Sequence, residues 1–258
     1  MYMTLPFIKM HGLGNDYIYV DCFPVQMQAM IAKTDLAELA RRVSDRHFGI
    51  GSDGLVLILP SDQADAMMRI FNADGSEAQM CGNAIRCVGK YLYESGLCPR
   101  TTMRIATLAG MRELNLQVKD NKVQTVTVMM GVPTFEPAVL QTETESVPYT
   151  AVSMGNPHAV FFRDAIPCLP EDTNVEFVRV RNPREIDVRV IERGSGETLA
   201  CGTGACASVV AAVQQGLTER LVTVHLPGGD LTIQWNINEP VYMTGPATEV
   251  FRGTYNID

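Results

Sequence analysis

Met80-Cys81-Gly82-Asn83-Ala84 and Ala200-Cys201-Gly202-Thr203-Gly204 repeat one motif in the two halves of the chain. Each Cys-Gly pair is followed by apolar residues at helical spacing, so each cysteine is predicted to precede a helix. The first N–H groups of a helix are unpaired and carry the positive end of the helix dipole. That environment should lower the pKa of a thiol and favour the thiolate. Two such sites predict two acid/base thiols that act on one substrate.

The sequence around these motifs predicts two similar α/β halves, each with strands, a glycine turn and then the Cys-Gly helix. The two helices should end near Gly96 and Gly216. A shorter helix is predicted after Asp35, with Glu38 as its capping-box partner. The predicted strands are Leu5–Met10, Asp16–Cys22, Gly54–Leu59, Met67–Phe71, Thr125–Met130, Ala151–Met154, Ala159–Phe162, Asp187–Glu192, Val222–Leu226, Leu231–Trp235 and Val241–Thr244. We expect a boundary near Lys122, with residues 1–122 and the C-terminal strand (about 248–258) in one domain and residues 123–247 in the other.

Composition limits the classes of function. The chain is 46% hydrophobic and 19% charged, which predicts a packed core. Its net charge of −8 argues against binding to nucleic acid or to an anionic membrane surface. No apolar run approaches the length of a membrane-spanning helix, and Met1–Met10 lacks the pattern of a signal peptide. We therefore expect a cytoplasmic location, with the seven cysteines reduced.

Several other interpretations of the cysteines do not fit their spacing. There is no C-x-x-C pair, so neither a zinc site nor a thioredoxin-type centre is indicated, and we predict no metal. No lysine lies in the motif loops, which argues against a pyridoxal cofactor. A Cys–His protease would need one nucleophile rather than two matched cysteines. A regulatory disulfide between Cys81 and Cys201 is left open. The remaining cysteines are interpreted as small buried hydrophobic residues: Cys22, Cys87, Cys98, Cys168 and Cys206.

Polar residues gather in the predicted turns. His158 follows Gly155-Asn156-Pro157, and Glu192-Arg193 enters a glycine turn. A lone histidine is more often structural, and a charged pair is often a solvated ion pair. The asparagines in turns are individually ordinary, but together they could line a polar site: Asn15, Asn72, Asn83, Asn156 and Asn174.

Several separate stretches together resemble the diaminopimelate epimerase family. They are Phe7–Asp16, Phe71–Glu77, Met80–Asn83, Gly155–His158 and Glu192–Thr198 through Cys201–Gly204, and the similarity extends to Gly245-Pro246-Ala247. The resemblance implies an α+β fold of two pseudo-symmetric α/β domains, each with mixed sheets wrapped around a central helix. It also implies interconversion of LL- and meso-diaminopimelate, without a cofactor, on the route to lysine and peptidoglycan.

The resemblance also implies roles for individual residues. The catalytic thiols are Cys81 and Cys201, tuned by His158 and Glu192. Residues that bind the carboxylate at the reacting carbon are Gly82, Asn83, Gly202 and Thr203. Residues that hold the distal end of the substrate are Asn72, Asn156, Asn174, Glu192 and Arg193, and Asn15 is a further substrate-binding residue. Gly54 departs from the family, since some members carry glutamine there; this puts one peripheral contact in doubt.

The two-thiol reading agrees with the chemistry of inversion, which needs a base on one face of a carbon and an acid on the other. One alternative is a proline-racemase-like enzyme, which typically has histidine after the first Cys-Gly, where this chain has Asn83. Arg193 also argues against it, because it suits a second carboxylate. A weaker alternative is a redox-responsive binding protein. A homodimer is left open.

Overall fold

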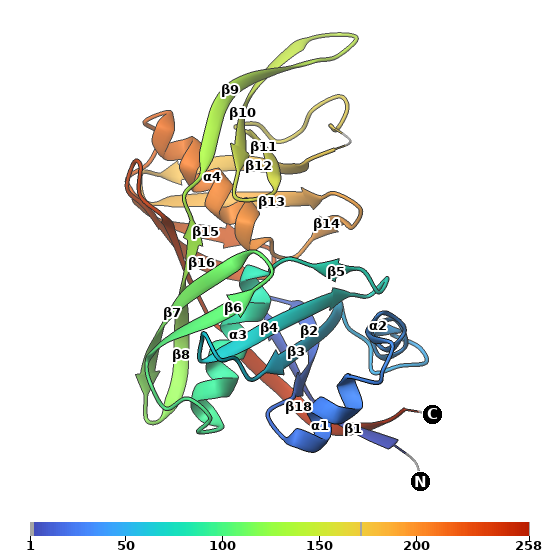
Figure 1. Ribbon diagram of the computed structural model, residues 1–258. Coiled ribbons are helices and arrows are strands. Elements are labelled where there is room, and N and C mark those ends of the chain that lie inside the picture. The colour runs from blue at the N-terminus through green and yellow to red at the C-terminus, as the bar shows by residue number, and fades with distance from the viewer. Residues whose placement is uncertain (1–2, 171, 258) are drawn as a thin grey trace. The chain divides into compact units, whose positions relative to one another are not determined.

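The computed structural model describes residues 3–170 and 172–257, and its chain divides into two compact units (Figure 1). Unit 1 consists of Met1–Val128 and Pro246–Asp258, and unit 2 consists of Met129–Gly245. The chain first passes from one unit to the other inside strand β8 (Lys122–Gly131), whose first residue is the predicted boundary.

Unit 1 is built on a mixed sheet. Strand β1 (Met3–Gly12) pairs antiparallel with β18 (Thr248–Ile257) and β2 (Asn15–Asp21). Next come β3 (Gly54–Leu59), parallel to β2, and β4 (Ala66–Asn72), antiparallel to β3. β4 pairs with the short β5 (Glu77–Ala78) and runs parallel to β6 (Thr102–Thr107). β7 (Gly110–Lys119) and β8 continue the sheet in antiparallel order.

Unit 2 repeats this pattern of pairing. Its strands are β9 (Thr134–Gln141), β10 (Ser146–Ser153), β11 (Pro157–Phe161), β12 (Asn174–Asn182), β13 (Glu185–Glu192), β14 (Gly196–Thr198), β15 (Leu221–Leu226), β16 (Gly229–Trp235) and β17 (Val241–Gly245). The β11–β12 and β13–β15 pairs are parallel, like β2–β3 and β4–β6, and the other pairs in the series are antiparallel. The pseudo-symmetric α+β architecture is therefore confirmed.

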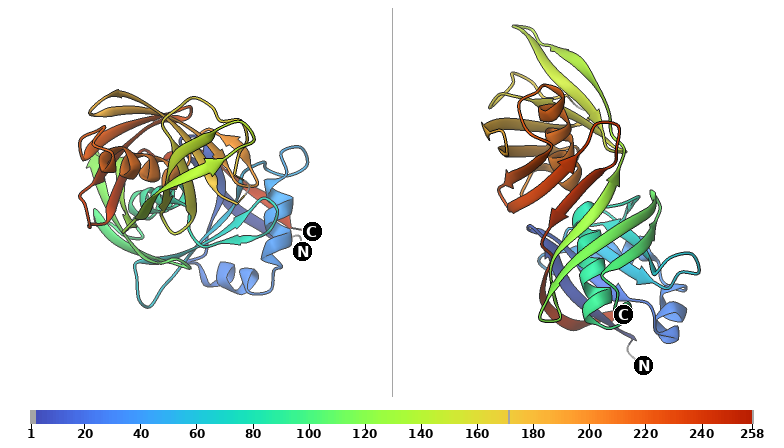
Figure 2. Two further views of the ribbon diagram at one scale, coloured as in Figure 1. Left: turned by 90° about the horizontal axis from the view of Figure 1, so that it is seen from above. Right: turned by 90° about the vertical axis from the view of Figure 1, so that its left-hand side faces the viewer.

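Each sheet wraps around one helix of 13 residues. In unit 1 this is α3 (Gly82–Glu94), which packs on β1, β2 and β7; in unit 2 it is α4 (Gly202–Gln214), which packs on β10–β13 and β15–β17 (Figures 1 and 2). Most residues of both helices are buried, as expected for a helix enclosed by strands. Gly96 and Gly216 follow their C-terminal ends with φ of 78° and 71°, which confirms the predicted helix ends.

Two further helices lie in unit 1. Helix α2 (Leu36–Ser44) begins as predicted, because the Asp35 carboxylate accepts a hydrogen bond from the N–H of Glu38 at 3.1 Å. Its buried residues join a core cluster with Leu5, Ile18 and Leu55. Helix α1 (Val25–Ile31) was not predicted. Strands β5, β6, β7, β9, β12 and β14 were not predicted from the sequence either.

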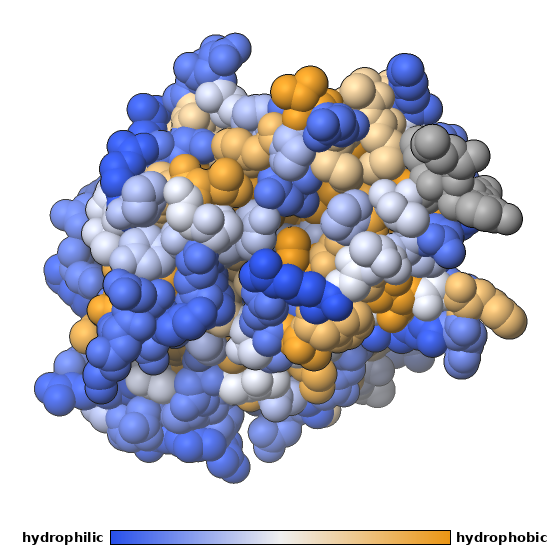
Figure 3. All heavy atoms as spheres, turned by 90° about the horizontal axis from the view of Figure 1, so that it is seen from below, coloured by the Kyte–Doolittle hydropathy of each residue, from blue (hydrophilic) through white to orange (hydrophobic). Residues whose placement is uncertain are grey.

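The surface is mixed in polarity. The face drawn in Figure 3 is mostly hydrophilic, with hydrophobic residues in separate groups. Among residues 3–170 and 172–257, no helix is both long and apolar enough to cross a membrane.

Candidate active site

Cys81 is the N-cap of α3 and has extended backbone, with φ of −136°. Its side chain is half-buried, and its thiol donates to the amide oxygen of Asn15 across 3.4 Å. Asn15 begins β2, and its amide nitrogen donates to Asp53 Oδ2 at 2.8 Å. The same oxygen accepts the N–H of Asp16 at 3.0 Å. Asp53 therefore orients the Asn15 side chain so that its oxygen faces the cysteine.

Charged residues form a network of ion pairs around Asp53, the residue that orients Asn15. Arg46 binds both Asp16, at 2.8 Å, and Asp53, at 2.9 Å, and Lys9 pairs with Asp16. Burial alone would raise the pKa of Asp16, but hydrogen bonds from Arg46 and Lys9 outweigh burial and leave this pKa below its usual value. Sequence reasoning missed Lys9, Arg46 and Asp53 as parts of this network.

The other predicted residues of unit 1 lie at the first turn of α3 and at the end of β4. Gly82 and Asn83 are buried in that first turn. Gly12 lies so close that a Cβ there would meet Arg86 Nη2 at 2.7 Å and Asn83 Cβ at 3.1 Å. Asn72 ends β4, and its amide donates to Ser76 Oγ at 3.0 Å, in the turn that the sequence predicted.

Cys201 is the N-cap of α4 and is buried. Its sulfur accepts the N–H of Gly204 at 3.4 Å and lies 3.5 Å from Thr203 Oγ1. The expected lowering of the pKa is wrong for this thiol. Burial, together with the negative charges of Glu192 and Glu176, raises the pKa of Cys201 well above its usual value. In this state Cys201 therefore favours the protonated form, which can serve as an acid.

Within unit 2, a chain of polar side chains connects Cys201 to Glu176. Asn156 donates to Thr203 Oγ1 at 3.3 Å, and its amide oxygen lies 3.2 Å from His158 Nε2. His158 is buried, and its Nδ1 lies 2.7 Å from Glu176 Oε1. The structure thus brings together three predicted residues of unit 2, Asn156, His158 and Thr203, beside Cys201. Sequence reasoning missed Glu176, although a carboxylate inside the apolar run Val175–Val178 was a usable signal.

The remaining predicted residues lie at the ends of β12 and β13. The side-chain oxygen of Asn174 accepts the backbone N–H of Arg193 at 2.9 Å. Glu192 accepts a hydrogen bond from Thr198 at 2.6 Å, and its charge contributes to the raised pKa of Cys201. The Arg193 side chain is exposed, with Nη1 3.4 Å from the carbonyl oxygen of Asp172, so it does not have the buried setting that a strong ion pair would need.

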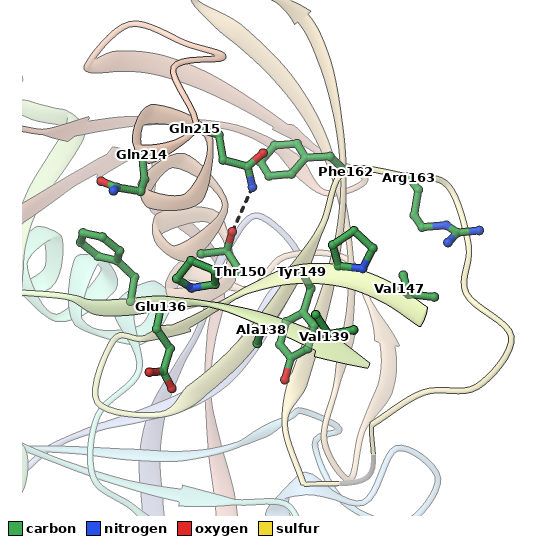
Figure 4. A pocket seen from close by; sticks show the side chains of 13 residues that line it. Glu136, Ala138, Val139, Val147, Tyr149, Thr150, Phe162, Arg163, Gln214 and Gln215 are labelled. Atoms are coloured by element: carbon green, nitrogen blue, oxygen red, sulfur yellow. Dashed lines mark hydrogen bonds between the residues drawn. The ribbon is translucent and has the colours of Figure 1, made fainter. Parts of the chain in front are cut away.

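Of two cavities in unit 2, only the smaller one has a predicted site residue in its wall. One of about 850 Å³ is lined by β9, β10, Phe162, Arg163, Gln214 and Gln215. Figure 4 shows its lining, including the hydrogen bond from Gln215 to Thr150, and no predicted site residue takes part. A second cavity of about 410 Å³ has His158 and Thr173 in its wall. No group of three or more His, Cys, Asp or Glu residues suited to a metal ion occurs in the described part of the chain.

The family model described as diaminopimelate epimerase matches residues 7–136 and 165–250, which include both cysteine motifs. The chain belongs to the diaminopimelate epimerase family. A diaminopimelate epimerase from Acetivibrio thermocellus is 49% identical, over 98% of this chain and 99% of its own. One from Pelotomaculum thermopropionicum is 51% identical, over 96% and 98%.

Solved structures with low sequence identity share the fold. A hydroxyproline epimerase from Agrobacterium vitis has a TM-score of 0.71 at 16% identity, over 99% of this chain and 93% of its own. A phenazine biosynthesis protein of the PhzF family from Bacillus anthracis has a TM-score of 0.73 at 16% identity, over 99% and 100%. The fold is thus shared beyond diaminopimelate epimerases, so the fold alone does not identify the substrate.

Proposed function

We propose that this member of the diaminopimelate epimerase family interconverts LL- and meso-2,6-diaminopimelate with Cys81 and Cys201 as its acid/base pair. The observation that supports the pair most directly is its symmetry. Each unit has one central helix, and each of those helices has a cysteine as its N-cap residue. Packing alone gives no reason for this match, whereas inversion of a carbon needs two acid/base groups.

The reaction inverts one α-carbon of the substrate. A thiolate removes the α-proton from one face, and the other thiol gives a proton to the opposite face. The two cysteines exchange these roles when the reaction runs in reverse. A single base would return the proton to the face it came from and would retain the configuration.

The carbanion that forms between the two proton transfers needs electrostatic stabilisation. The N–H groups at the start of α3 and α4 are suited to bind the adjacent carboxylate, because they are unpaired within the helix. Gly82 and Asn83 supply them in one unit, and Gly202 and Thr203 supply them in the other. Donors that are fixed before the reaction contribute most when charge develops on the substrate.

The distal carboxylate and ammonium need separate partners. Arg193 is suited to the carboxylate, since a guanidinium binds a carboxylate through two parallel hydrogen bonds. Asn174 fixes the Arg193 backbone, and Asn72 and Asn156 add neutral donors. Glu192 is suited to the distal ammonium. These contacts would distinguish diaminopimelate from amino acids with one carboxylate.

This chemistry requires neither a metal nor an organic cofactor, because thiols supply both protons and bases. We propose a cytoplasmic enzyme of lysine and peptidoglycan precursor synthesis that acts on a small molecule and not on nucleic acid. A homodimer is compatible with this function.

Turnover of LL-diaminopimelate under reducing conditions, without pyridoxal phosphate, tests the proposal. Formation of the meso isomer is the expected result, with no racemisation of L-proline. Turnover of proline but not of diaminopimelate would favour the proline-racemase-like alternative. Turnover of neither substrate, with the fold intact, would favour a binding protein.

A further inference from the structure

Glu176 places a carboxyl group where an apolar side chain would cost the fold less free energy. It lies in β12 between Val175 and Phe177, and its side chain is fully buried. One oxygen lies 2.7 Å from His158 Nδ1, and the other has no hydrogen-bond partner among the described residues. Burial of an incompletely bonded carboxyl group destabilises a fold. Its presence therefore points to a role in the neighbouring site.

His158 is connected to Cys201 through Asn156 and Thr203, and each group along this path can donate a hydrogen bond to the next. The amide oxygen of Asn156 can only accept, so His158 Nε2, 3.2 Å away, carries a proton and donates it. The amide nitrogen of Asn156 can only donate, and it donates to Thr203 Oγ1 at 3.3 Å. The hydroxyl hydrogen of Thr203 is then available to point at Cys201 Sγ, 3.5 Å away.

Glu176 can keep the proton on His158 Nε2 in two ways. A neutral carboxyl group can donate to Nδ1 of a neutral imidazole, or a carboxylate can accept from Nδ1 of an imidazolium. Both forms leave the pair with no net charge and with the Nε2 hydrogen directed at Asn156. Burial raises the pKa of Glu176, and the neighbouring His158 opposes this effect.

We propose that Glu176 is a positioning residue that holds His158 with its proton on Nε2 and thereby directs the Thr203 hydroxyl toward the sulfur of Cys201. This inference rests on the proposed function, because it assumes that Cys201 transfers protons. A donor beside the sulfur stabilises the thiolate more than the thiol. Cys201 can then act as a base in spite of its burial and the nearby carboxylates.

The effect should be confined to one of the two thiols. Cys81 belongs to the other unit, and its neighbour is Asn15, which Asp53 orients. A change at Glu176 should therefore impair proton transfer by Cys201 and leave transfer by Cys81 nearly as it is. General damage to the fold would impair both.

The test measures halide release from the two isomers of a β-halo analogue of diaminopimelate by the full-length enzyme. In Cys81→Ser the remaining thiol is Cys201, and in Cys201→Ser it is Cys81. Glu176→Met should lower Cys201-dependent release at least about tenfold, as loss of an orienting partner does for metal-bound histidines. Glu176→Gln should lower it less, because its amide can still donate to Nδ1. Cys81-dependent release should change less than about twofold, within the range of distant surface changes.

Ser208→Ala is the matched control. It removes a buried hydrogen bond of α4, from Ser208 Oγ to the carbonyl oxygen of Gly204 at 2.8 Å, without touching the polar chain. It should leave halide release by both thiols unchanged. Equal losses in both single-thiol backgrounds, or no loss with Glu176→Met, would overturn the role of Glu176. If neither single-thiol variant prefers one isomer, the proposed pair of thiols fails instead.

A spectroscopic measurement keeps the proposal testable even if Glu176→Met does not fold. The chain has four histidines, so ¹⁵N NMR of histidine-labelled protein is tractable, with His158→Asn to assign the signals. The wild type should show a protonated Nε2 in His158. An unprotonated Nε2 there would overturn the proposal regardless of the kinetics.

Discussion

The thiol of Cys81 donates to the amide oxygen of Asn15 across 3.4 Å. The sulfur of Cys201 has the opposite kind of neighbour, because it accepts the N–H of Gly204 at 3.4 Å. The units share one topology and place their cysteines at equivalent helix positions, but the two sulfurs have different partners. The two sulfurs therefore differ in their hydrogen-bond environment, with a side-chain acceptor at Cys81 and a backbone donor at Cys201.

Cys81→Ala and Cys201→Ala should each lower epimerisation at least about 100-fold, the usual contribution of an acid/base group. Each cysteine precedes its helix, so loss of its sulfur should leave the circular dichroism spectrum unchanged. Cys87→Ala and Cys206→Ala are matched controls within α3 and α4, and they should retain activity. Near-normal epimerisation by either N-cap variant would refute the two-base assignment.

Cys81→Ser and Cys201→Ser should each retain elimination from one isomer of a β-halo substrate analogue. Elimination needs one base on one face, and serine can still hydrogen-bond at the other position. The two variants should prefer opposite isomers in a halide-release assay. Equal release from both isomers by both variants would contradict the assignment of one cysteine to each face.

Arg193→Met should lower kcat/KM for diaminopimelate roughly 10- to 100-fold, as expected for loss of hydrogen bonds to a charged group. Arg193→Lys should lower it less, and L-lysine should be a poor substrate of the wild type. The exposure of Arg193 makes this effect smaller than for a fully buried pair. Arg189→Met, in strand β13 just before Arg193, is the control and should have little effect. Comparable turnover of lysine and diaminopimelate by the wild type would remove the proposed role of Arg193.

Asp16→Asn should lower the free energy of unfolding at pH 7 by about 1–3 kcal/mol, since Lys9 and Arg46 lose a charged partner. The pKa of Asp16 is lower in the folded state, so its carboxylate stabilises the fold fully above about pH 4. This contribution is lost as the pH falls through the lower, folded pKa. Urea unfolding between pH 7 and pH 3 should show the two proteins converging at the acid end. Asp164→Asn, at an exposed position, should show no such difference.

Gly204→Ala should lower kcat about tenfold or more, because its Cβ would lie 2.7 Å from Glu176 Oε1 and 3.4 Å from Cys201 Sγ. Gly89→Ala is the comparison in the other central helix. Its Cβ would meet Leu114 Cδ2 at 2.7 Å, and a leucine side chain can move away. It should retain activity. Steady-state kinetics of both variants test this prediction. Equal losses of kcat would mean that crowding in either central helix lowers activity, whether or not it is next to Cys201.

The sequence predicted the parts of the fold that have strong local signals. The two central helices have continuous apolar faces and closing glycines at Gly96 and Gly216, and α2 has its own capping residue, Asp35. Helix α1 has seven residues and no side-chain cap, so it lacked such a signal. Strand β9 contains Pro137, a residue that argues against a strand. Strand β12 starts with buried residues on both faces and shows no early alternation.

The candidate site was predictable only where motif and chemistry agreed. The helix positions of Cys81 and Cys201 followed from the Cys-Gly motif, whereas the pKa of Cys201 depends on burial and on Glu192 and Glu176. Glu176 lies in β12 and Glu192 in β13, so their closeness to the sulfur of Cys201 depends on tertiary packing. The same holds for Asp53, which reaches Asn15 across the β2–β3 pair. The assigned roles of the site residues stay predictions until the variants are measured.

The pairing of β1 with β18 has a consequence for synthesis of the chain on the ribosome. Met3 lies opposite Ile257, so the first strand to be made must wait for the last strand before it is paired on that side. Unit 2, Met129–Gly245, is one continuous segment and is made before that partner emerges. The inserted unit can therefore fold during translation, while the unit that contains Cys81 is completed only once β18 has been made. Loss of strand β18 would leave β1 with an open edge, which is prone to pair with other chains.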